Sequence, residues 1–130
     1  MKSKLVRKNP MHAPKPVGKY SHVTIIPKDA TMYAFSGQIG LGQDDQLPQT
    51  LWEQIINTFQ HIETILASEG MDATHIVKVN IWATEEIDWD HFYEQWECMF
   101  GESYPSMTIA YVSALGLPEI KIELEIWAAK

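Results

Sequence analysis

Apolar residues recur along the chain with two different periods, and these periods predict the secondary structure. From Thr50 to Glu69 and from Trp89 to Phe100 the spacing is three and four, which is typical of helices with one buried face. Gly70, Asp88 and Gly101 stand where helix caps are expected. Five other segments alternate or form short apolar runs, as strands do: 22–26, 32–40, 75–84, 108–112 and 119–127. The order is therefore ββαβαββ, an α+β fold, and KLVRK (residues 4–8) is a candidate for a further N-terminal strand.

Two helices suffice to cover one face of such a sheet, so the other face is expected to be open. The last predicted strand alternates strictly, with Ile120, Ile122, Leu124 and Ile126 on one face and Lys121, Glu123, Glu125 and Trp127 on the other. The strand at 75–84 places Val77, Val79, Ile81 and Ala83 together, opposite Ile76, Lys78, Asn80 and Trp82. Beside the charged groups, the open face is expected to carry Trp82, Ile109, Tyr111 and Trp127. Exposed apolar surface of this kind marks interfaces, so the pattern predicts a homo-oligomer with small-molecule clefts between subunits.

Length and composition restrict the class of protein. At 130 residues, 45% of them apolar and 21% charged, the chain has the size and make-up of one globular domain, residues 1–130. It has no apolar run of the ~18–20 residues that a membrane span needs, and no secretory signal precedes the fold. Cys98 is the single cysteine, which excludes an intrachain disulfide and fits a reducing compartment, so a cytoplasmic location is expected. The net charge of −7 disfavours nucleic-acid binding, although Lys2, Lys4, Arg7 and Lys8 crowd the N-terminus.

Short motifs for metal or nucleophilic chemistry are not convincing. The histidines, at positions 12, 22, 61, 75 and 91, do not show the spacing of a zinc site, and no metal is expected. Ser36 precedes Gly37 but does not lie in a G-x-S-x-G elbow. The glycines at 37, 40 and 42 instead favour close approach of a backbone. Glu123 has two interpretations. It is a charged residue at a solvent-exposed strand edge or, if its face is buried between subunits, a carboxylate of a functional site.

Several ordered blocks together resemble a known family. APKPVGKYSHV, YAFSGQIGL, HIVKVNIWAT, the second helix, YPSMTIAYV and KIELEIWA are similar, in this order, to the signature blocks of the RidA/YjgF family, also called the endoribonuclease L-PSP family. The similarity runs from about residue 5 to residue 129. It implies a chorismate-mutase-like fold and a homotrimer with a barrel-like centre and three clefts, each shared by two subunits. The best-known members of the family hydrolyse 2-imino acids to 2-keto acids and ammonia, without a metal or organic cofactor.

The resemblance also implies a set of site residues. Tyr20, Ser36 and Gly37 are expected to line the cleft, and Glu123 to hold the attacking water, polarised by the backbone near Ile109. Active deaminases carry Pro-x-Arg-Ser/Thr, whose arginine grips the substrate carboxylate with two parallel hydrogen bonds. This chain has Met107 at the arginine position. Two further cleft positions differ, because Ile109 replaces a frequent cysteine and Tyr93 replaces an asparagine.

Loss of the arginine is expected to weaken transition-state binding substantially. A charge-assisted pair contributes about 1.5–3 kcal/mol, which corresponds to roughly 10- to 100-fold in rate. Lys19, Lys78 and Lys121 are possible substitutes that lack the fork geometry. We therefore predict a trimer that binds a small, less anionic ligand, with or without cofactor-independent hydrolysis. The alternative is a non-catalytic binding or regulatory trimer, and ribonuclease activity, also attributed to the family, is disfavoured by the net charge of −7.

Overall fold

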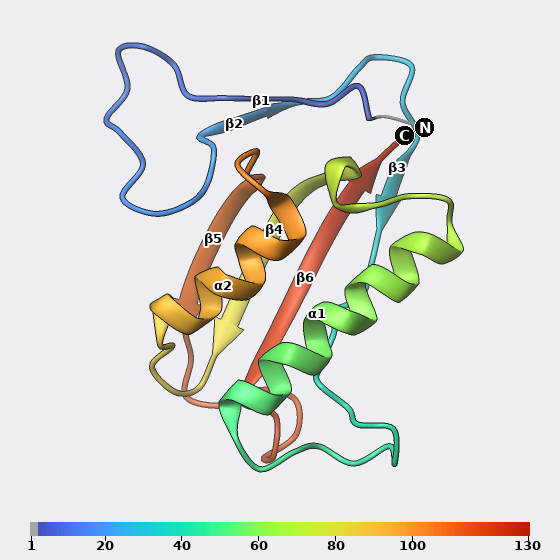
Figure 1. The fold of residues 1–130 in the computed structure, drawn as a ribbon, viewed down its shortest axis with the longest axis vertical. Helices are drawn as coiled ribbons and strands as arrows, with labels where there is room; N and C mark the ends of the chain where they lie inside the picture. The colour runs from blue at the N-terminus through green and yellow to red at the C-terminus, as the bar shows by residue number, and fades with distance from the viewer. Residues whose placement is uncertain (1–2) are drawn as a thin grey trace.

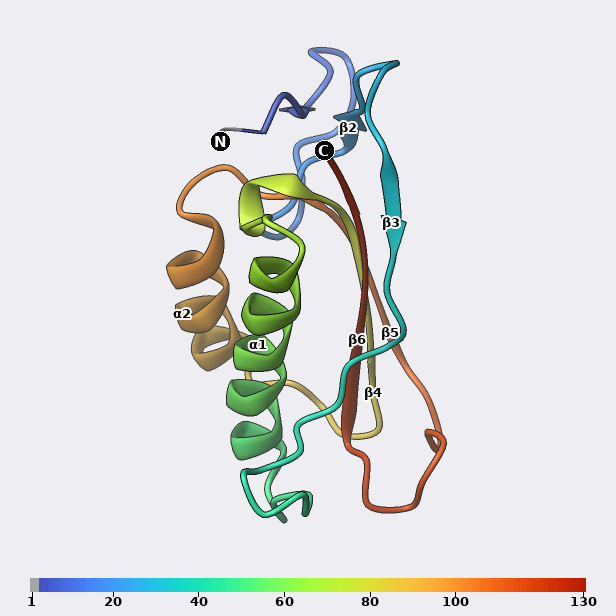
Figure 2. The same ribbon diagram turned by 90° about the vertical axis from the view of Figure 1, so that its right-hand side faces the viewer.

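The computed structural model describes residues 3–130, so that Lys2, one of the basic N-terminal residues, lies outside the described part. Two helices, α1 (Leu51–Ser68) and α2 (Trp89–Phe100), pack side by side on one face of a sheet (Figures 1 and 2). The sheet has the order β3-β6-β4-β5, formed by Met32–Ala34, Ile122–Ala129, Ile76–Ala83 and Ser106–Tyr111. Strands β4 and β5 are parallel and the other pairs antiparallel, which confirms the expected α+β class. Neither helix has the length and apolar character needed to cross a membrane.

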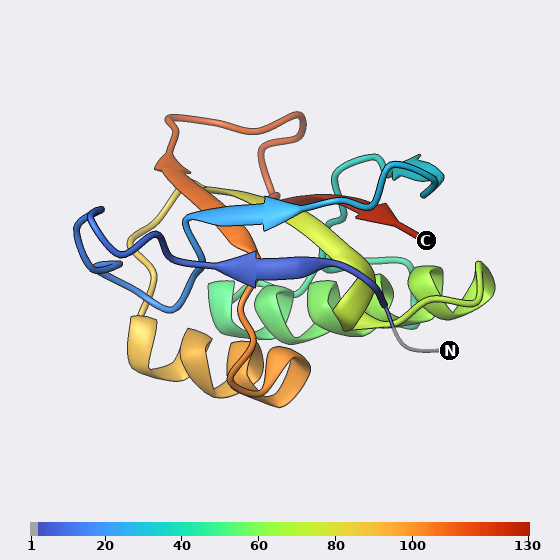
Figure 3. The same ribbon diagram turned by 90° about the horizontal axis from the view of Figure 1, so that it is seen from above.

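The predicted strands divide between two sheets rather than forming one. β1 (Val6–Lys8), within the KLVRK segment, pairs with β2 (Val23–Ile25), and this ribbon lies across one end of the molecule (Figure 3). Pro27, which cannot donate a ladder hydrogen bond, follows soon after β2, and the chain turns there before β3 begins. The predicted strand at 32–40 is also interrupted, since only Met32–Ala34 and a single bridge at Gln38 pair with β6.

Arg7 attaches this ribbon to the rest of the fold. Its guanidinium donates to the carbonyl oxygens of Ser103, Ala73 and Ile76 at 2.6, 2.8 and 2.8 Å, and it lies over the ring of Phe100. Burial lowers the pKa of Arg7 to about 10, against a smaller opposing effect of Asp72. An arginine placed at the start of the chain therefore joins β1 to the segments before β4 and after α2.

The core forms between the helices and the sheet, as the apolar stripes predict. Its most buried side chains come from α1 (Ile55, Phe59, Ile62, Leu66), α2 (Phe92, Trp96) and the facing strands (Ile76, Val79, Ile81, Ile122, Leu124, Ile126). The helix ends follow the expected caps: Asp88 accepts from the backbone of His91, and Gly70 and Gly101 have φ of 72° and 64°. The left-handed backbone at these glycines is strained for other residues.

Two expectations about strand faces are wrong. The register between β4 and β6 shifts at Val77, and this bulge leaves Ile76, not Val77, in the core with Val79. Ile109 and Tyr111 do not lie on the open face, because β5 pairs in register with β4 and places Ile109 beside the buried Ile81. The hydroxyl of Tyr111 instead accepts from the backbone of Ile87, just before α2. The segment TIAYV is nearly uniformly apolar, so alternation could not assign its faces.

Candidate functional site

Glu123 lies against the backbone that follows β3. Gln38 and Leu124 exchange two backbone hydrogen bonds of 2.7 and 3.0 Å, and this bridge holds the preceding Ser36 and Gly37 beside β6. A Cβ on Gly37 would lie only 2.7 Å from the carboxyl carbon of Glu123. Three of the predicted site residues, Ser36, Gly37 and Glu123, are therefore brought together on the open face.

The Glu123 side chain is partly buried, and its carboxylate oxygens remain available as hydrogen-bond acceptors. It makes no hydrogen bond or ion pair with the rest of residues 3–130 and lies opposite Trp82 on β4. Its neighbours on the same face are engaged: Glu125 accepts from Asn80 Nδ2 at 3.0 Å, and Lys121 pairs with Glu85. An ionised carboxylate with unused acceptor positions can hold a water molecule or a ligand N–H group. Of the two predicted carboxylates on this strand face, Glu123 is the one suited to a binding role.

The second group of predicted residues is organised by α2. The Tyr93 hydroxyl accepts from the backbone of Lys19 at 3.2 Å, and the Trp96 indole donates to the Lys19 carbonyl at 2.7 Å. A Cβ on Gly18 would lie 2.5 Å from the Tyr93 hydroxyl, so the loop before Tyr20 depends on a glycine there. Gly18 and Trp96 are further residues of this region that no sequence pattern indicated, although the glycine in VGKY was a usable signal.

Hydrogen bonds made by Ser21 bring the neighbouring Tyr20 close to the start of β5. Ser21 donates from its backbone to the Pro105 carbonyl at 3.1 Å and from its hydroxyl to the Tyr104 carbonyl at 2.7 Å. These bonds place Tyr20 beside the segment that leads into Met107. Tyr20, Tyr93, Met107 and Ile109 therefore belong to one region, at the β5 edge of the sheet.

Met107 has an apolar environment. It is partly buried, pairs with Val79 and packs against the core on the helix-covered side of the sheet, as Ile109 does. The lysines considered as substitutes for an arginine are engaged elsewhere: Lys19 pairs with Glu97, Lys121 pairs with Glu85, and Lys78 donates to the Thr108 hydroxyl at 2.8 Å. Met107 thus has apolar neighbours, and each candidate cation is directed to another partner.

The two groups do not meet within one chain. Glu123 lies on β6 and Met107 on β5, with β4 between them, so they are two strand spacings or about 10 Å apart across the sheet and are also offset along the strands, because Met107 is level with Ile126. They also lie on opposite faces, because Glu123 shares the open face whereas Met107 packs with the helices. Within residues 3–130, no cluster of three or more His, Cys, Asp or Glu side chains could hold a metal ion. Within one chain the two groups therefore do not form one site.

Comparison with known proteins gives a consistent assignment. Residues 10–130 match the model of the family described as Endoribonuclease L-PSP. A RutC family protein of Aquifex aeolicus is 31% identical over 91% of this chain and 94% of its own length. The 2-iminobutanoate/2-iminopropanoate deaminase of Bos taurus is 29% identical over 87% of this chain and 83% of that protein. In structure, the chain resembles a conserved Rid family protein of unknown function, YyfB of Yersinia pestis, with a TM-score of 0.83 at 19% identity, covering 97% and 98% of the two chains.

Proposed function

Because the chain belongs to the endoribonuclease L-PSP family, the RidA/YjgF family whose blocks its sequence resembles, we propose that it acts as a homotrimer with intersubunit clefts. Each cleft binds a small, neutral or weakly anionic metabolite and hydrolyses an imine-type bond without a cofactor. Ordinary 2-imino acids are poor substrates, because Met107 replaces the carboxylate-binding arginine. The single cysteine, Cys98, agrees with a cytoplasmic site of action.

The observation that carries this proposal is the separation of the two residue groups. The group of Ser36, Gly37 and Glu123 lies on the open face, and the group of Tyr20, Tyr93 and Met107 lies at the opposite edge. A neighbouring copy packed against the open face of this chain brings its own group of Tyr20, Tyr93 and Met107 to the Glu123 group of this chain. The open face also offers apolar surface to such a neighbour, since Trp127 is 41% exposed.

In the proposed reaction, water adds to the carbon of the C=N bond. The Glu123 carboxylate holds the water and accepts one of its protons as the C–O bond forms, and this proton then passes from Glu123 to the nitrogen to give a carbinolamine. Glu123 next moves the hydroxyl proton of the carbinolamine to the nitrogen as the C–N bond breaks, so that imine and water yield a carbonyl compound and ammonia. Ser36 and Gly37 orient the substrate, Tyr20 and Tyr93 wall the cleft, and the backbone near Ile109 polarises the water.

The apolar side chain of Met107 sets the substrate class. A thioether packs well against hydrocarbon but offers a carboxylate no hydrogen-bond donor. The resulting loss of about 1.5–3 kcal/mol for a carboxylate substrate corresponds to roughly 10- to 100-fold in kcat/KM. A substrate without a carboxylate next to the imine avoids this loss.

A non-catalytic binding or regulatory trimer is the second candidate. It requires a cleft closed by Met107, Tyr93 and Trp82, with the carboxylate engaged in structure. The unpaired state of Glu123 within residues 3–130 favours hydrolysis over this alternative.

Two measurements test the proposal. Sedimentation equilibrium is expected to give three times the 14.9 kDa chain mass, and a stable monomer or dimer contradicts it. A coupled assay that generates 2-aminoacrylate and follows its hydrolysis is expected to show at least about tenfold less activity than an arginine-bearing relative. A rate equal to that of the relative refutes the role given to Met107.

A further inference from the structure

A cavity lies at the end of the molecule where β6 finishes, away from both residue groups of the cleft. It encloses about 330 Å³, which is within the range of small-molecule sites. Its lining comes from the segment before β1, the turn between β2 and β3, the end of α1, η1 (Ala73–His75) and the end of β6. The lining includes none of the residues assigned to the cleft.

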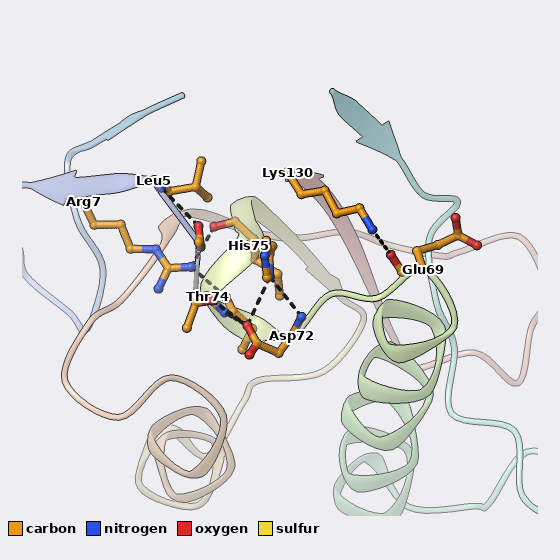
Figure 4. A network of polar contacts seen from close by, with 10 residues as sticks. Leu5, Arg7, Glu69, Asp72, Thr74, His75 and Lys130 are labelled. Atoms are coloured by element: carbon orange, nitrogen blue, oxygen red, sulfur yellow. Dashed lines mark hydrogen bonds and ion pairs between the residues drawn. The ribbon is translucent and has the colours of Figure 1, made fainter. Parts of the chain in front are cut away.

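His75 supplies a buried polar group to this cavity. Its side chain is 5% exposed, and Asp72 holds one edge of the ring (Figure 4): the Asp72 backbone N–H donates to Nδ1 at 3.1 Å, and Asp72 Oδ1 lies 3.2 Å from the same nitrogen. Because Nδ1 accepts the Asp72 N–H, the neutral ring that keeps this bond carries its proton on Nε2, whereas a ring protonated at Nδ1 would donate to Asp72 Oδ1 and lose the backbone bond. The tautomer that keeps the backbone bond makes Nε2 a donor. This nitrogen has no hydrogen-bond partner among residues 3–130, and the ring is part of the cavity wall.

Basic side chains outnumber acidic side chains around the cavity. Lys4 and Lys130 line it, against the one acidic side chain of Asp29, in a chain whose net charge is −7. Lys130 Nζ donates to the Glu69 carbonyl at 2.6 Å (Figure 4), and this bond fixes the ammonium at the cavity while two of its three protons stay available.

The remainder of the lining is mostly apolar. Leu5, Pro27, Ala30 and Ala129 contribute to the wall, and the lysine stems add hydrocarbon to it. A fully hydrated inorganic anion would leave this surface without a partner. A ligand that combines one negative group with a short apolar tail uses both kinds of surface.

We infer that this cavity binds a small carboxylate with an aliphatic or aromatic tail, at a site separate from the proposed cleft. The carboxylate accepts from His75 Nε2 and faces the ammonium groups of Lys4 and Lys130. The tail packs on Leu5, Pro27 and Ala129. Because Asp72 orients the imidazole and Glu69 orients Lys130, both donors are held in place before the ligand arrives, which reduces the entropy lost on binding.

The test is a titration of the full chain with hexanoate, followed by amide and imidazole NMR signals. We expect saturable shifts at Ala30, Gly70 and Ala129 and at the ring of His75. Hexanamide has the same shape without the charge and is expected to bind about tenfold more weakly, since it lacks a charge-assisted hydrogen bond. Absence of saturable hexanoate binding, or equal binding of hexanamide, overturns the proposal.

Matched variants assign the donors. His75→Asn keeps a side-chain acceptor for the Asp72 backbone but removes the Nε2 donor, and is expected to weaken hexanoate binding about tenfold. Lys4→Gln removes an exposed charge without touching the core and is expected to cost about two- to fivefold. Lys8→Gln removes the same charge from an exposed residue outside the cavity and should leave the affinity unchanged.

The pattern of effects decides the outcome whether or not one variant folds. If His75→Asn fails to give a native spectrum, Lys4→Gln and the hexanamide comparison still test the site. Equal effects of Lys4→Gln and Lys8→Gln indicate only long-range attraction and refute the site. Shifts centred on Gly37 or Met107 instead place the carboxylate in the cleft and refute the inference, without bearing on hydrolysis there.

Discussion

The carboxylate of Glu123 lies directly against the backbone of Gly37, in space that only a residue without a side chain leaves open. The contact joins β6 to the segment after β3, which the Gln38–Leu124 bridge holds at the same level. The position of the carboxylate is thus determined by two segments more than 80 residues apart in the chain. The glycine of the SGQ block is required by this contact.

Substitution Gly37→Ala should displace the carboxylate of Glu123. The added methyl group would lie 2.7 Å from its carboxyl carbon and 2.8 Å from its Cγ, so either the side chain or the backbone must move. Because the clashing atoms belong to the flexible Glu123 side chain, the substitution is expected to lower the free energy of unfolding by about 1 kcal/mol, the lower end of the range for overpacking, measured by urea denaturation. Gly116→Ala is the control, because a Cβ there meets nothing within 4 Å. Equal stability of the two variants would contradict the contact.

In the proposed function, substitution Met107→Arg should create a carboxylate clamp. If Glu123 and the rest of the cleft are intact, hydrolysis of 2-aminoacrylate in the coupled assay is expected to rise by about tenfold or more over the wild-type protein. Met107→Leu keeps an apolar side chain of similar volume and should give no gain. A variant that keeps the wild-type assembly but shows no increase would mean that other parts of the catalytic machinery are absent.

Substitution Gln54→Leu should destabilise the start of β6. The buried Gln54 amide donates to the carbonyls of Pro48 and Glu119 at 2.8 and 3.0 Å, and its oxygen accepts from the Lys121 backbone at 2.9 Å. Leucine fills the volume but leaves these backbone groups unpaired, which is expected to cost about 3 kcal/mol in unfolding free energy. Gln60→Leu, at an exposed position of the same helix, should change stability little. A small effect at position 54 would show that water replaces the amide.

Asp72 should make the stability depend on acidic pH. Hydrogen bonding from Thr74 is the main reason that the pKa of Asp72 is below its ordinary value of 3.8. The ionised form therefore stabilises the fold fully above about pH 4, and this contribution is lost as pH falls through the lower pKa of the folded state. In urea unfolding, the difference between wild type and Asp72→Asn should be present at pH 7 and shrink below pH 4. Thr74→Ala, which removes the hydroxyl donor, should reduce the same pH-dependent part, and parallel pH curves for all three proteins would refute it.

Much of the fold follows from local patterns. Thr50, Asp88 and Gly101 define helix ends through contacts within a few residues, and the stripe of Phe59 and Ile62 identifies the buried face. The faces of β6 are equally readable, because Ile122 and Leu124 alternate with charged residues. For the site, the resemblance to a family predicted roles for Ser36, Gly37 and Glu123, which the structure places close together, and the roles themselves stay predictions. Tyr20, Tyr93 and Met107 also fall in one region, but the docking of Gly18 and Trp96 was not anticipated.

The sequence by itself determined the order and type of the elements, the helix-facing stripes and the presence of Met107 where the resemblance leads us to expect an arginine, because these depend on residue identity and on neighbours close in the chain. Only the tertiary structure decided the face of Ile109, the bulge at Val77, the division into two sheets and the cavity beside His75. Each of these depends on the register or docking of segments distant in sequence. Several strand registers are compatible with the same local pattern, and long-range packing determines which register forms.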